Sequence, residues 1–177
     1  MANLNLKEKD IYLRPLSLND VNSNYLSWLQ DPEVMSGIAT KDYTLAKLNE
    51  YVSNRLNDYN VHFFAIICNV SNIHIGNIKL DFYDNDANTI ELGLLIGNKN
   101  YWGKGIGKQV CKLILEYAFN VLNIRKIYLA VYENNPGAKR LYEKLGFKIE
   151  GCLRKHIAVN GEYFDKYYMG IFKEEAI

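Results

Sequence analysis

The spacing of apolar residues alternates between a helical and a strand period along the chain, and this alternation predicts its elements. After Thr44, apolar residues recur at spacings of three and four, which predicts an amphipathic helix. The period then becomes that of strands, and residues 61–68, 73–83 and 89–96 predict an antiparallel meander joined by turns rich in Asn and Asp. The apolar positions of the middle strand change parity at Gly76-Asn77, which indicates a β-bulge.

The N-terminal part predicts a strand followed by a capped helix. Residues 11–14 read as a strand, and Ser17 with Asp20 three residues later forms a capping-box pattern. We therefore expect a helix that begins at Ser17 and ends at Asp31-Pro32, because proline cannot continue it.

The C-terminal part starts with a glycine-rich loop that leads into a long amphipathic helix over residues 106–121. A strand over 126–133 and a short helix over 134–146 follow. Residues 147–172 then predict a hairpin that turns at Asn160-Gly161. Together these elements predict a mixed α/β layer protein.

Length and charge narrow the class of protein. The 177 residues suit one domain, 1–177, since no linker or repeat divides them. The net charge of +1 gives no bulk attraction for nucleic acid or an anionic membrane. The N-terminus lacks a secretory signal and no run is long enough to span a bilayer, so we expect a soluble, cytoplasmic protein. Cys68, Cys111 and Cys152 have neither disulfide nor zinc spacing and are expected to be buried small hydrophobes.

The glycine-rich loop "YWGKGIGK" predicts an anion site, because the N-terminus of a helix presents unpaired N–H groups and the positive end of its dipole. A Walker loop does not fit, since only three residues separate Gly103 from Gly107 and Lys108 is followed by Gln109. A dinucleotide fingerprint does not fit either, because its third glycine is missing. The alternative is a turn that only lets a strand and a helix pack closely.

A second motif, "ENNPGAKRLYEKLGFKIEG", follows the next strand, and together the two motifs resemble the acetyl-CoA-binding core of the GNAT superfamily of N-acetyltransferases. The segments "YLRPLSLNDV", "IGNIKL", "IELGLLIG" and "FDKYYMGIF" resemble the group that contains ribosomal-protein, polyamine and amino-sugar acetyltransferases. The resemblance implies a mixed, mostly antiparallel sheet flanked by about four helices. It also implies acetyl-CoA as co-substrate, no metal, and direct attack by an amine in a ternary complex.

The resemblance also assigns residues to the coenzyme. Asn135 would bind the pantetheine arm, and Tyr142 would protonate the departing thiolate. Trp102 stands where many members have Gln or Arg, a departure of little consequence if backbone donors bind the phosphates. The remaining coenzyme contacts are expected from the phosphate loop, the preceding strand and the helix after Asn135: Leu94, Leu95, Ile96, Gly103, Lys104, Gly105, Ile106, Gly107, Lys108, Ala138 and Lys139.

The incoming amine must lose a proton before attack, and Glu91 is our candidate base. Each catalytic nomination has a structural alternative: Tyr142 could pack against the sheet, and Glu91 could be a paired or solvent-facing strand residue. His62, His74 and His156 accompany no Ser or Cys motif, so a hydrolase triad is unsupported.

The acceptor is expected to be a small-molecule or N-terminal amine, and specifically an amino-sugar precursor or a protein N-terminus. The alternatives are a polyamine acetyltransferase or a non-catalytic acyl-CoA sensor, with a nucleotide-binding protein more distant. Nucleic acid and membrane partners are not expected, whereas a homodimer is allowed. The expected acceptor-side residues mix aromatic rings with carboxylates: Trp28, Asp31, Glu33, Tyr43, Phe82, Tyr83 and Tyr163.

Overall fold

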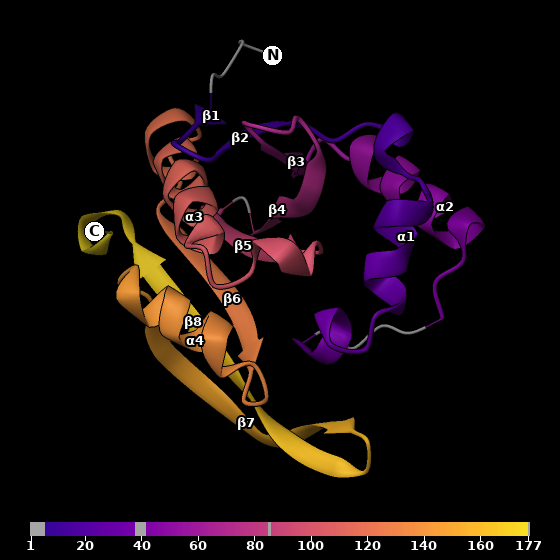
Figure 1. The fold of residues 1–177 in the computed structure, drawn as a ribbon. Coiled ribbons are helices and arrows are strands. Elements are labelled where there is room, and N and C mark those ends of the chain that lie inside the picture. The colour runs from indigo at the N-terminus through magenta and orange to yellow at the C-terminus, as the bar shows by residue number, and fades with distance from the viewer. Residues whose placement is uncertain (1–5, 38–41, 85, 177) are drawn as a thin grey trace.

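An eight-stranded sheet runs through the structure in the order β1-β2-β3-β4-β5-β6-β8-β7 (Figure 1). The computed structural model describes residues 6–37, 42–84 and 86–176. All strand pairs are antiparallel except β5 with β6, as the GNAT resemblance predicted. The strands are β1 (Leu6–Lys7), β2 (Ile11–Pro15), β3 (Val61–Cys68), β4 (His74–Asp84), β5 (Thr89–Ile96), β6 (Lys126–Tyr132), β7 (Lys148–Val159) and β8 (Glu162–Phe172).

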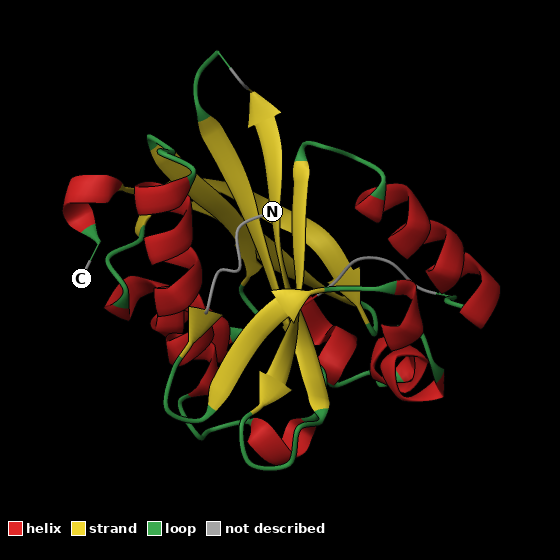
Figure 2. Ribbon diagram, turned by 90° about the horizontal axis from the view of Figure 1, so that it is seen from above, coloured by secondary structure: helices red, strands yellow, loops and turns green. Residues whose placement is uncertain are grey.

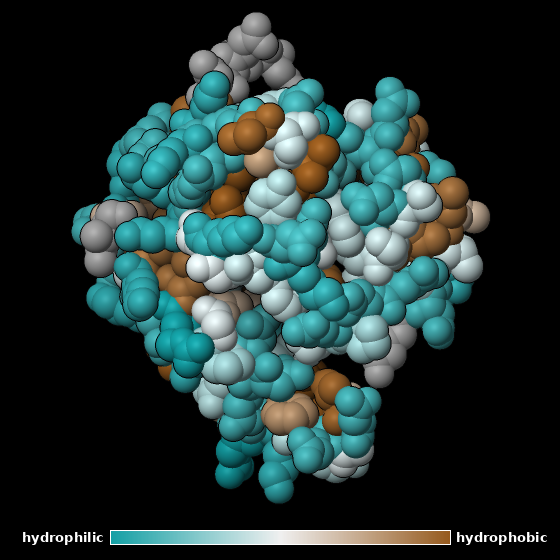
Figure 3. All heavy atoms as spheres, viewed as in Figure 1, coloured by the Kyte–Doolittle hydropathy of each residue, from teal (hydrophilic) through white to brown (hydrophobic). Residues whose placement is uncertain are grey.

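Helices cover both faces of the sheet. The α-helices are α1 (Ser23–Gln30), α2 (Leu45–Leu56), α3 (Ile106–Glu116) and α4 (Pro136–Lys144). α1 and α2 lie on one side and α3 and α4 on the other (Figures 1 and 2). On the outer face seen in Figure 3, hydrophilic residues predominate and the hydrophobic areas are separate from one another.

Strand β3 explains why the core is divided into two clusters. Its residues alternate between the faces: Phe64 and Ile66 join the cluster under α3 and α4, whereas Phe63 and Ala65 join the cluster under α1 and α2. A strand covered on both faces reads as a continuous apolar run, which is what residues 61–68 show.

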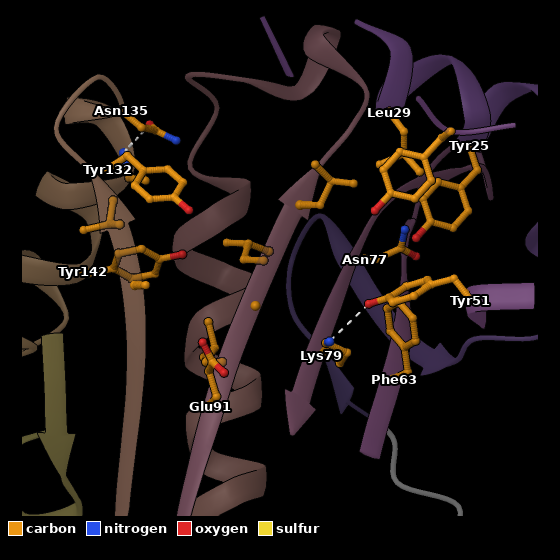
Figure 4. Close-up of a pocket in the computed structure, with 18 residues that line it drawn as sticks. Tyr25, Leu29, Tyr51, Phe63, Asn77, Lys79, Glu91, Tyr132, Asn135 and Tyr142 are labelled. Atoms are coloured by element: carbon orange, nitrogen blue, oxygen red, sulfur yellow. Dashed lines mark hydrogen bonds between the residues drawn. The ribbon is translucent and has the colours of Figure 1, made fainter. Parts of the chain in front are cut away.

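Two strands part in the middle of the sheet. The parallel ladder between β5 and β6 has only three pairs, and the last joins Glu91 to Tyr128. Beyond this point β5 leans away from β6 (Figure 4). Beyond Glu91, the edge of β5 that faces β6 therefore has no partner strand in the described part of the chain.

Several predicted elements are confirmed with shifted boundaries. The closing hairpin turns at Asn160 and Gly161, whose φ angles of 52° and 85° suit this turn. The bulge lies one residue before the predicted place, where Ile67 pairs with His74 and Ile75 is skipped. The predicted element order is confirmed, and the structure adds β1 before it.

Two predicted helices differ from the structure. The capping box of Ser17 and Asp20 closes only a 3-10 turn, Leu18–Asp20. The reason is a second cap: the Asn22 side chain accepts hydrogen bonds from the amides of Asn24 and Tyr25 and starts α1 afresh. The long helix predicted to Val121 is α-helical only to Glu116 and ends in a π-helical turn, Tyr117–Val121.

The expectation for the cysteines is correct for two of the three. Cys68 and Cys111 are buried, but Cys152 is exposed. Cys152 belongs to β7, an edge strand of the sheet whose residues are mostly exposed, so its side chain reaches solvent.

Candidate active site

A cavity of about 330 Å³ lies where β5 and β6 separate (Figure 4). Glu91 of β5 and Tyr142 of α4 line it, so the two proposed catalytic side chains share one space. Tyr43 lines it too, as do Leu94, Leu95, Asn135 and Ala138 from the expected coenzyme set. The cavity between the two separated strands is thus lined by residues that are distant in sequence.

The glycine loop precedes α3 in a conformation that favours glycine. Gly103 and Gly105 have φ angles of 70° and 76°, and Gly105 caps the helix. The backbone amides from Gly103 to Lys108 donate no hydrogen bond to any residue in the described ranges. Because Lys104 and Lys108 are exposed beside them, this loop is an electropositive row of free donors suited to phosphate.

Close packing fixes the position of the loop. A Cβ atom on Gly107 would lie 2.9 Å from Cδ2 of Leu141, so Gly107 lets α3 approach α4. Ile106 is buried in the core and anchors the first turn. The indole N–H of Trp102 donates to the carbonyl oxygen of Ile96 at 2.8 Å. The loop is therefore both a turn that allows close packing and a set of amide donors.

Asn135 starts α4 and faces the cavity. Its Oδ1 accepts a hydrogen bond from the amide of Ala138 at 3.1 Å, which leaves its NH₂ group to donate. Lys139 is engaged elsewhere: its Nζ lies 3.9 Å from a Glu143 carboxylate oxygen and 4.5 Å from the Tyr167 ring centre. Lys139 is not among the residues that line the cavity.

Tyr142 is buried, with 6% of its surface exposed, and its ring packs edge-on against Phe147. Burial raises the pKa of its phenol far above the ordinary value, and the nearby Cys111 adds to this effect. The phenol therefore keeps its proton at physiological pH. Its oxygen points toward β5 in Figure 4 and bonds to no other described residue.

Glu91 occupies the same sheet face as its β4 neighbours. It pairs in register with Asp81, whose Oδ2 lies 2.6 Å from the ammonium of Lys79. Asp81 does not line the cavity, so Glu91 is the carboxylate that lines it in the described part of the chain. Its position suits a proton acceptor for a bound amine.

The other expected acceptor residues are scattered. Trp28 of α1 is buried against the sheet, and a Cβ on Gly97 would lie 2.0 Å from its ring. Phe82 packs beside His62 on the opposite sheet face. The side chain of Tyr83 lies outside the described residues, and Tyr163 is exposed on the hairpin.

Glu33 and Asp31 both bind Lys99, with Nζ to oxygen distances of 3.0 and 2.6 Å. Asp31 is half-buried, and the hydrogen bond from Lys99 lowers its pKa. Asp31 and Tyr43 also line a neighbouring groove of about 1,070 Å³ between α1, α2 and the tip of the β7–β8 hairpin. Glu33 lines neither space.

Sequence reasoning missed the polar residues opposite Tyr142. Tyr25, Tyr51, Asn77 and Lys79 line the cavity from α1, α2 and β4 (Figure 4). A signal was present, because Asn77 and Lys79 alternate with the buried Ile78 and Leu80 in "IGNIKL". A polar pair on one face of a central strand indicates a lined cavity.

Neither a metal centre nor a membrane helix is found in the residues that the structure describes. His, Cys, Asp and Glu side chains form no group of three that could hold a metal ion there. Over the same ranges, each helix is too short or too polar to cross a bilayer.

Known proteins share this fold and align with nearly the whole length of the chain. Spermidine N(1)-acetyltransferase of Escherichia coli K12 is 29% identical over 167 residues, which cover 93% of this chain and 87% of the relative. The structure of spermidine N-acetyltransferase from Vibrio cholerae in complex with CoA and spermine superposes with a TM-score of 0.85 at 27% identity, covering 95% of this chain and 98% of that one. A GNAT-family acetyltransferase from Bacillus anthracis gives a TM-score of 0.81 at 25% identity, covering 96% and 98%.

The sequence profile of the acetyltransferase (GNAT) domain matches residues 10–148. This span contains the glycine loop, all but the last three residues of the second motif, the parted strands β5 and β6, and the cavity residues of α4. The chain therefore belongs to the GNAT family of acetyl-CoA-dependent N-acetyltransferases.

Proposed function

We propose that this acetyltransferase passes the acetyl group of acetyl-CoA directly to the primary amine of a small acceptor, with polyamines as the first class to consider. The proposal rests on one observation: Glu91 and Tyr142 line the same cavity, beside the edge of β5 that has no partner strand. A base, an acid and a row of strand amides are the groups that thioester aminolysis needs.

The coenzyme would bind from the glycine loop inward. Its pyrophosphate would meet the free amides of Gly103 to Lys108, and its pantetheine arm would lie along Leu94–Ile96 in the place that a neighbouring strand would otherwise fill. The NH₂ group of Asn135 would donate to a carbonyl oxygen of the arm.

Groups on the two walls of the cavity would then carry out the reaction. Glu91, directly or through water, takes a proton from the ammonium form of the acceptor, and the amine attacks the thioester carbonyl. Backbone amides of β5 stabilise the oxyanion. As the C–S bond breaks, Tyr142 donates its proton to the departing sulfur, and the nitrogen of the intermediate loses its remaining extra proton, which restores the phenol through water.

Similarity supports polyamines ahead of the amino-sugar precursor or protein N-terminus that we first expected. Spermidine is named as the substrate of the Escherichia coli relative, and spermine is bound in the Vibrio cholerae structure. Tyr25, Tyr43 and Tyr51 add ring faces that attract cations.

A second candidate is an amine that also carries oxygen atoms, such as an amino-sugar precursor. It is favoured by one observation: Asn77 and Lys79, two hydrogen-bond donors, line the cavity wall across from Tyr142. A polyamine has no oxygen for them to bind.

An acceptor panel tests the proposal. Purified protein with acetyl-CoA would be given spermidine, a nucleotide-linked amino sugar, and a peptide that starts with Ala or Ser. We expect stoichiometric CoA release and a product heavier by one acetyl group with at least one of the small amines. If acetyl-CoA binds but no amine increases CoA release, the chain is an acyl-CoA-binding protein and the proposal fails.

A further inference from the structure

The side-chain amide of Asn77 is a buried donor without a partner. Asn77 is 3% exposed, lines the cavity, and its Nδ2 bonds to no described residue. In Figure 4 it lies between Tyr25 and Tyr51, across the cavity from Tyr142. An unsatisfied buried donor is costly, so a native structure needs a reason to keep one.

His74 fixes which way this amide points. The Nε2 atom of His74 lies 2.9 Å from the carbonyl oxygen of Gly76 and 2.8 Å from Oδ1 of Asn77. Since a backbone carbonyl can only accept, Nε2 must carry the proton, and the atom of Asn77 that faces it must be the oxygen. The NH₂ group is therefore held away from His74 by the hydrogen-bond network.

Two further donors stand beside Asn77. The ammonium of Lys79 donates to Tyr51 Oη at 3.2 Å and pairs with Asp81 Oδ2 at 2.6 Å, which leaves its third proton unassigned. Tyr51 accepts from Lys79 through its oxygen, so its own O–H remains to donate. Neither an ammonium nor an amide NH₂ can accept a hydrogen bond.

We propose that Asn77, Lys79 and Tyr51 form a subsite for an oxygen-bearing group of the acceptor: a hydroxyl, carbonyl, carboxylate or phosphate. Oxygen lone pairs satisfy all three donors, whereas a methylene chain or an ammonium has no lone pair to offer any of them. This inference rests on the proposed function and favours its second candidate, an oxygen-rich amine.

The sheet register places the subsite at a distance from Glu91 that one small acceptor can span. Lys79 pairs with Gly93 and Asn77 with Leu95, so they lie two and four residues along β5 from Glu91 and one strand across. With about 3.4 Å per residue and about 4.8 Å between strands, the backbone separations are roughly 8 and 14 Å. Gly93 between them presents open space, because nothing lies within 4 Å of a Cβ built there. A ring-sized acceptor can reach from Glu91 to the donors over Gly93.

Matched amines test the subsite. We compare glucosamine with cyclohexylamine, and 6-aminohexanoate with hexylamine, in wild type, Asn77→Asp and Tyr51→Phe. Asn77→Asp keeps the oxygen that His74 needs but replaces the donor by an anionic acceptor. Asn54→Asp makes the same chemical change on the exposed face of α2 and serves as control.

Wild type should prefer the oxygen-bearing amine of at least one pair by about 10- to 100-fold in kcat/KM, as expected when a site built for hydrogen bonds meets an analogue without them. Asn77→Asp should abolish most of this preference through KM and improve the relative use of spermidine, and Tyr51→Phe should reduce it severalfold. Asn54→Asp should change nothing.

Equal use of both members of each pair by wild type, or an unchanged preference in Asn77→Asp, would overturn the inference and leave the proposed function intact. Binding of the same amines to CoA-saturated protein, measured by calorimetry, gives the preference without turnover. A protein that binds them selectively but acetylates none would instead refute the proposed function alone.

Discussion

The indole N–H of Trp102 donates a 2.8 Å hydrogen bond to the carbonyl oxygen of Ile96, so the residue before the glycine loop is joined to the end of β5. The phosphate-binding amides and the strand expected to hold the pantetheine arm are thereby kept in one fixed relation. Loss of this bond in Trp102→Phe should weaken acetyl-CoA binding about 3- to 10-fold with unchanged kcat, as measured by calorimetry and initial rates. A change in kcat with unchanged affinity would contradict this role.

Gly105→Val should weaken acetyl-CoA binding by at least about tenfold. A β-branched residue is strained at the φ of 76° found there, so the neighbouring amides must move away from the phosphates. Gly151→Val is the control, since Gly151 also has open space but lies on the exposed edge strand without a positive φ. Calorimetric affinity and Tm are measured for both variants. Unchanged affinity in a folded Gly105→Val would refute the loop assignment.

Glu91→Gln should slow acetylation most at neutral pH and approach the wild-type rate as rising pH deprotonates the acceptor amine. The measurement is kcat/KM from pH 6.5 to 10 with one amine. The control is Glu150→Gln, which alters a carboxylate of β7 that pairs with Lys126 of β6. A pH profile parallel to that of wild type would exclude Glu91 as the base.

The sequence predicted the fold better than it predicted the acceptor side of the cavity. Element order and the hairpin turn follow from local rules: apolar period, caps and the Asn160-Gly161 turn. Asn135 and Tyr142, which line the cavity, and the glycine loop before α3 could be proposed from the sequence because they sit in contiguous motifs. The parting of β5 from β6 could not be derived from pattern, because it depends on which strands pair beyond Glu91.

The acceptor residues depend on contacts between distant segments. Trp28 looked like an acceptor wall, but its ring fills the space above Gly97. Asn77 lies in a strand whose polar face becomes a cavity wall only when α1 and α2 are placed beside it. No local rule links Asn77 to His74, whose protonated nitrogen sets the direction of its amide.

Gly93→Leu should narrow the acceptor space without disturbing the fold. Nothing lies within 4 Å of a Cβ at Gly93, and the residue lines the cavity between Glu91 and Leu95. We expect kcat/KM for the preferred amine to fall about tenfold or more, with Tm close to that of wild type. An unchanged acceptor profile would show that the amine binds elsewhere.

Stability should depend on Asp20 at low pH. Burial opposes its ionisation, but hydrogen bonds from Arg14 and Ser17 outweigh burial and lower its pKa to about 2. A lowered pKa stabilises the folded state fully above the ordinary value near 4, and this contribution is lost as pH falls from about 4 to about 2. Because Arg14 is partly exposed, we expect about 1–2 kcal/mol.

The measurement is the free energy of urea unfolding between pH 5 and pH 2.5. Wild type should lose about 1–2 kcal/mol more than Asp20→Asn over this interval, and Asp86→Asn, altered in an exposed turn, should behave as wild type. An equal pH slope in wild type and Asp20→Asn would show that the Arg14 pair contributes nothing.

The most direct test of the account is the turnover of Tyr142→Phe. The substitution keeps the buried ring and its contact with Phe147 but removes the proton that Tyr142 would donate to the departing sulfur. We expect unchanged acetyl-CoA affinity and a fall in kcat of about 10²–10⁴-fold, with selective rescue by an acyl donor whose thiol has a lower pKa. Near-normal turnover with acetyl-CoA, or no selective rescue by the better leaving group, would show that Tyr142 only packs against the sheet and that solvent supplies the proton.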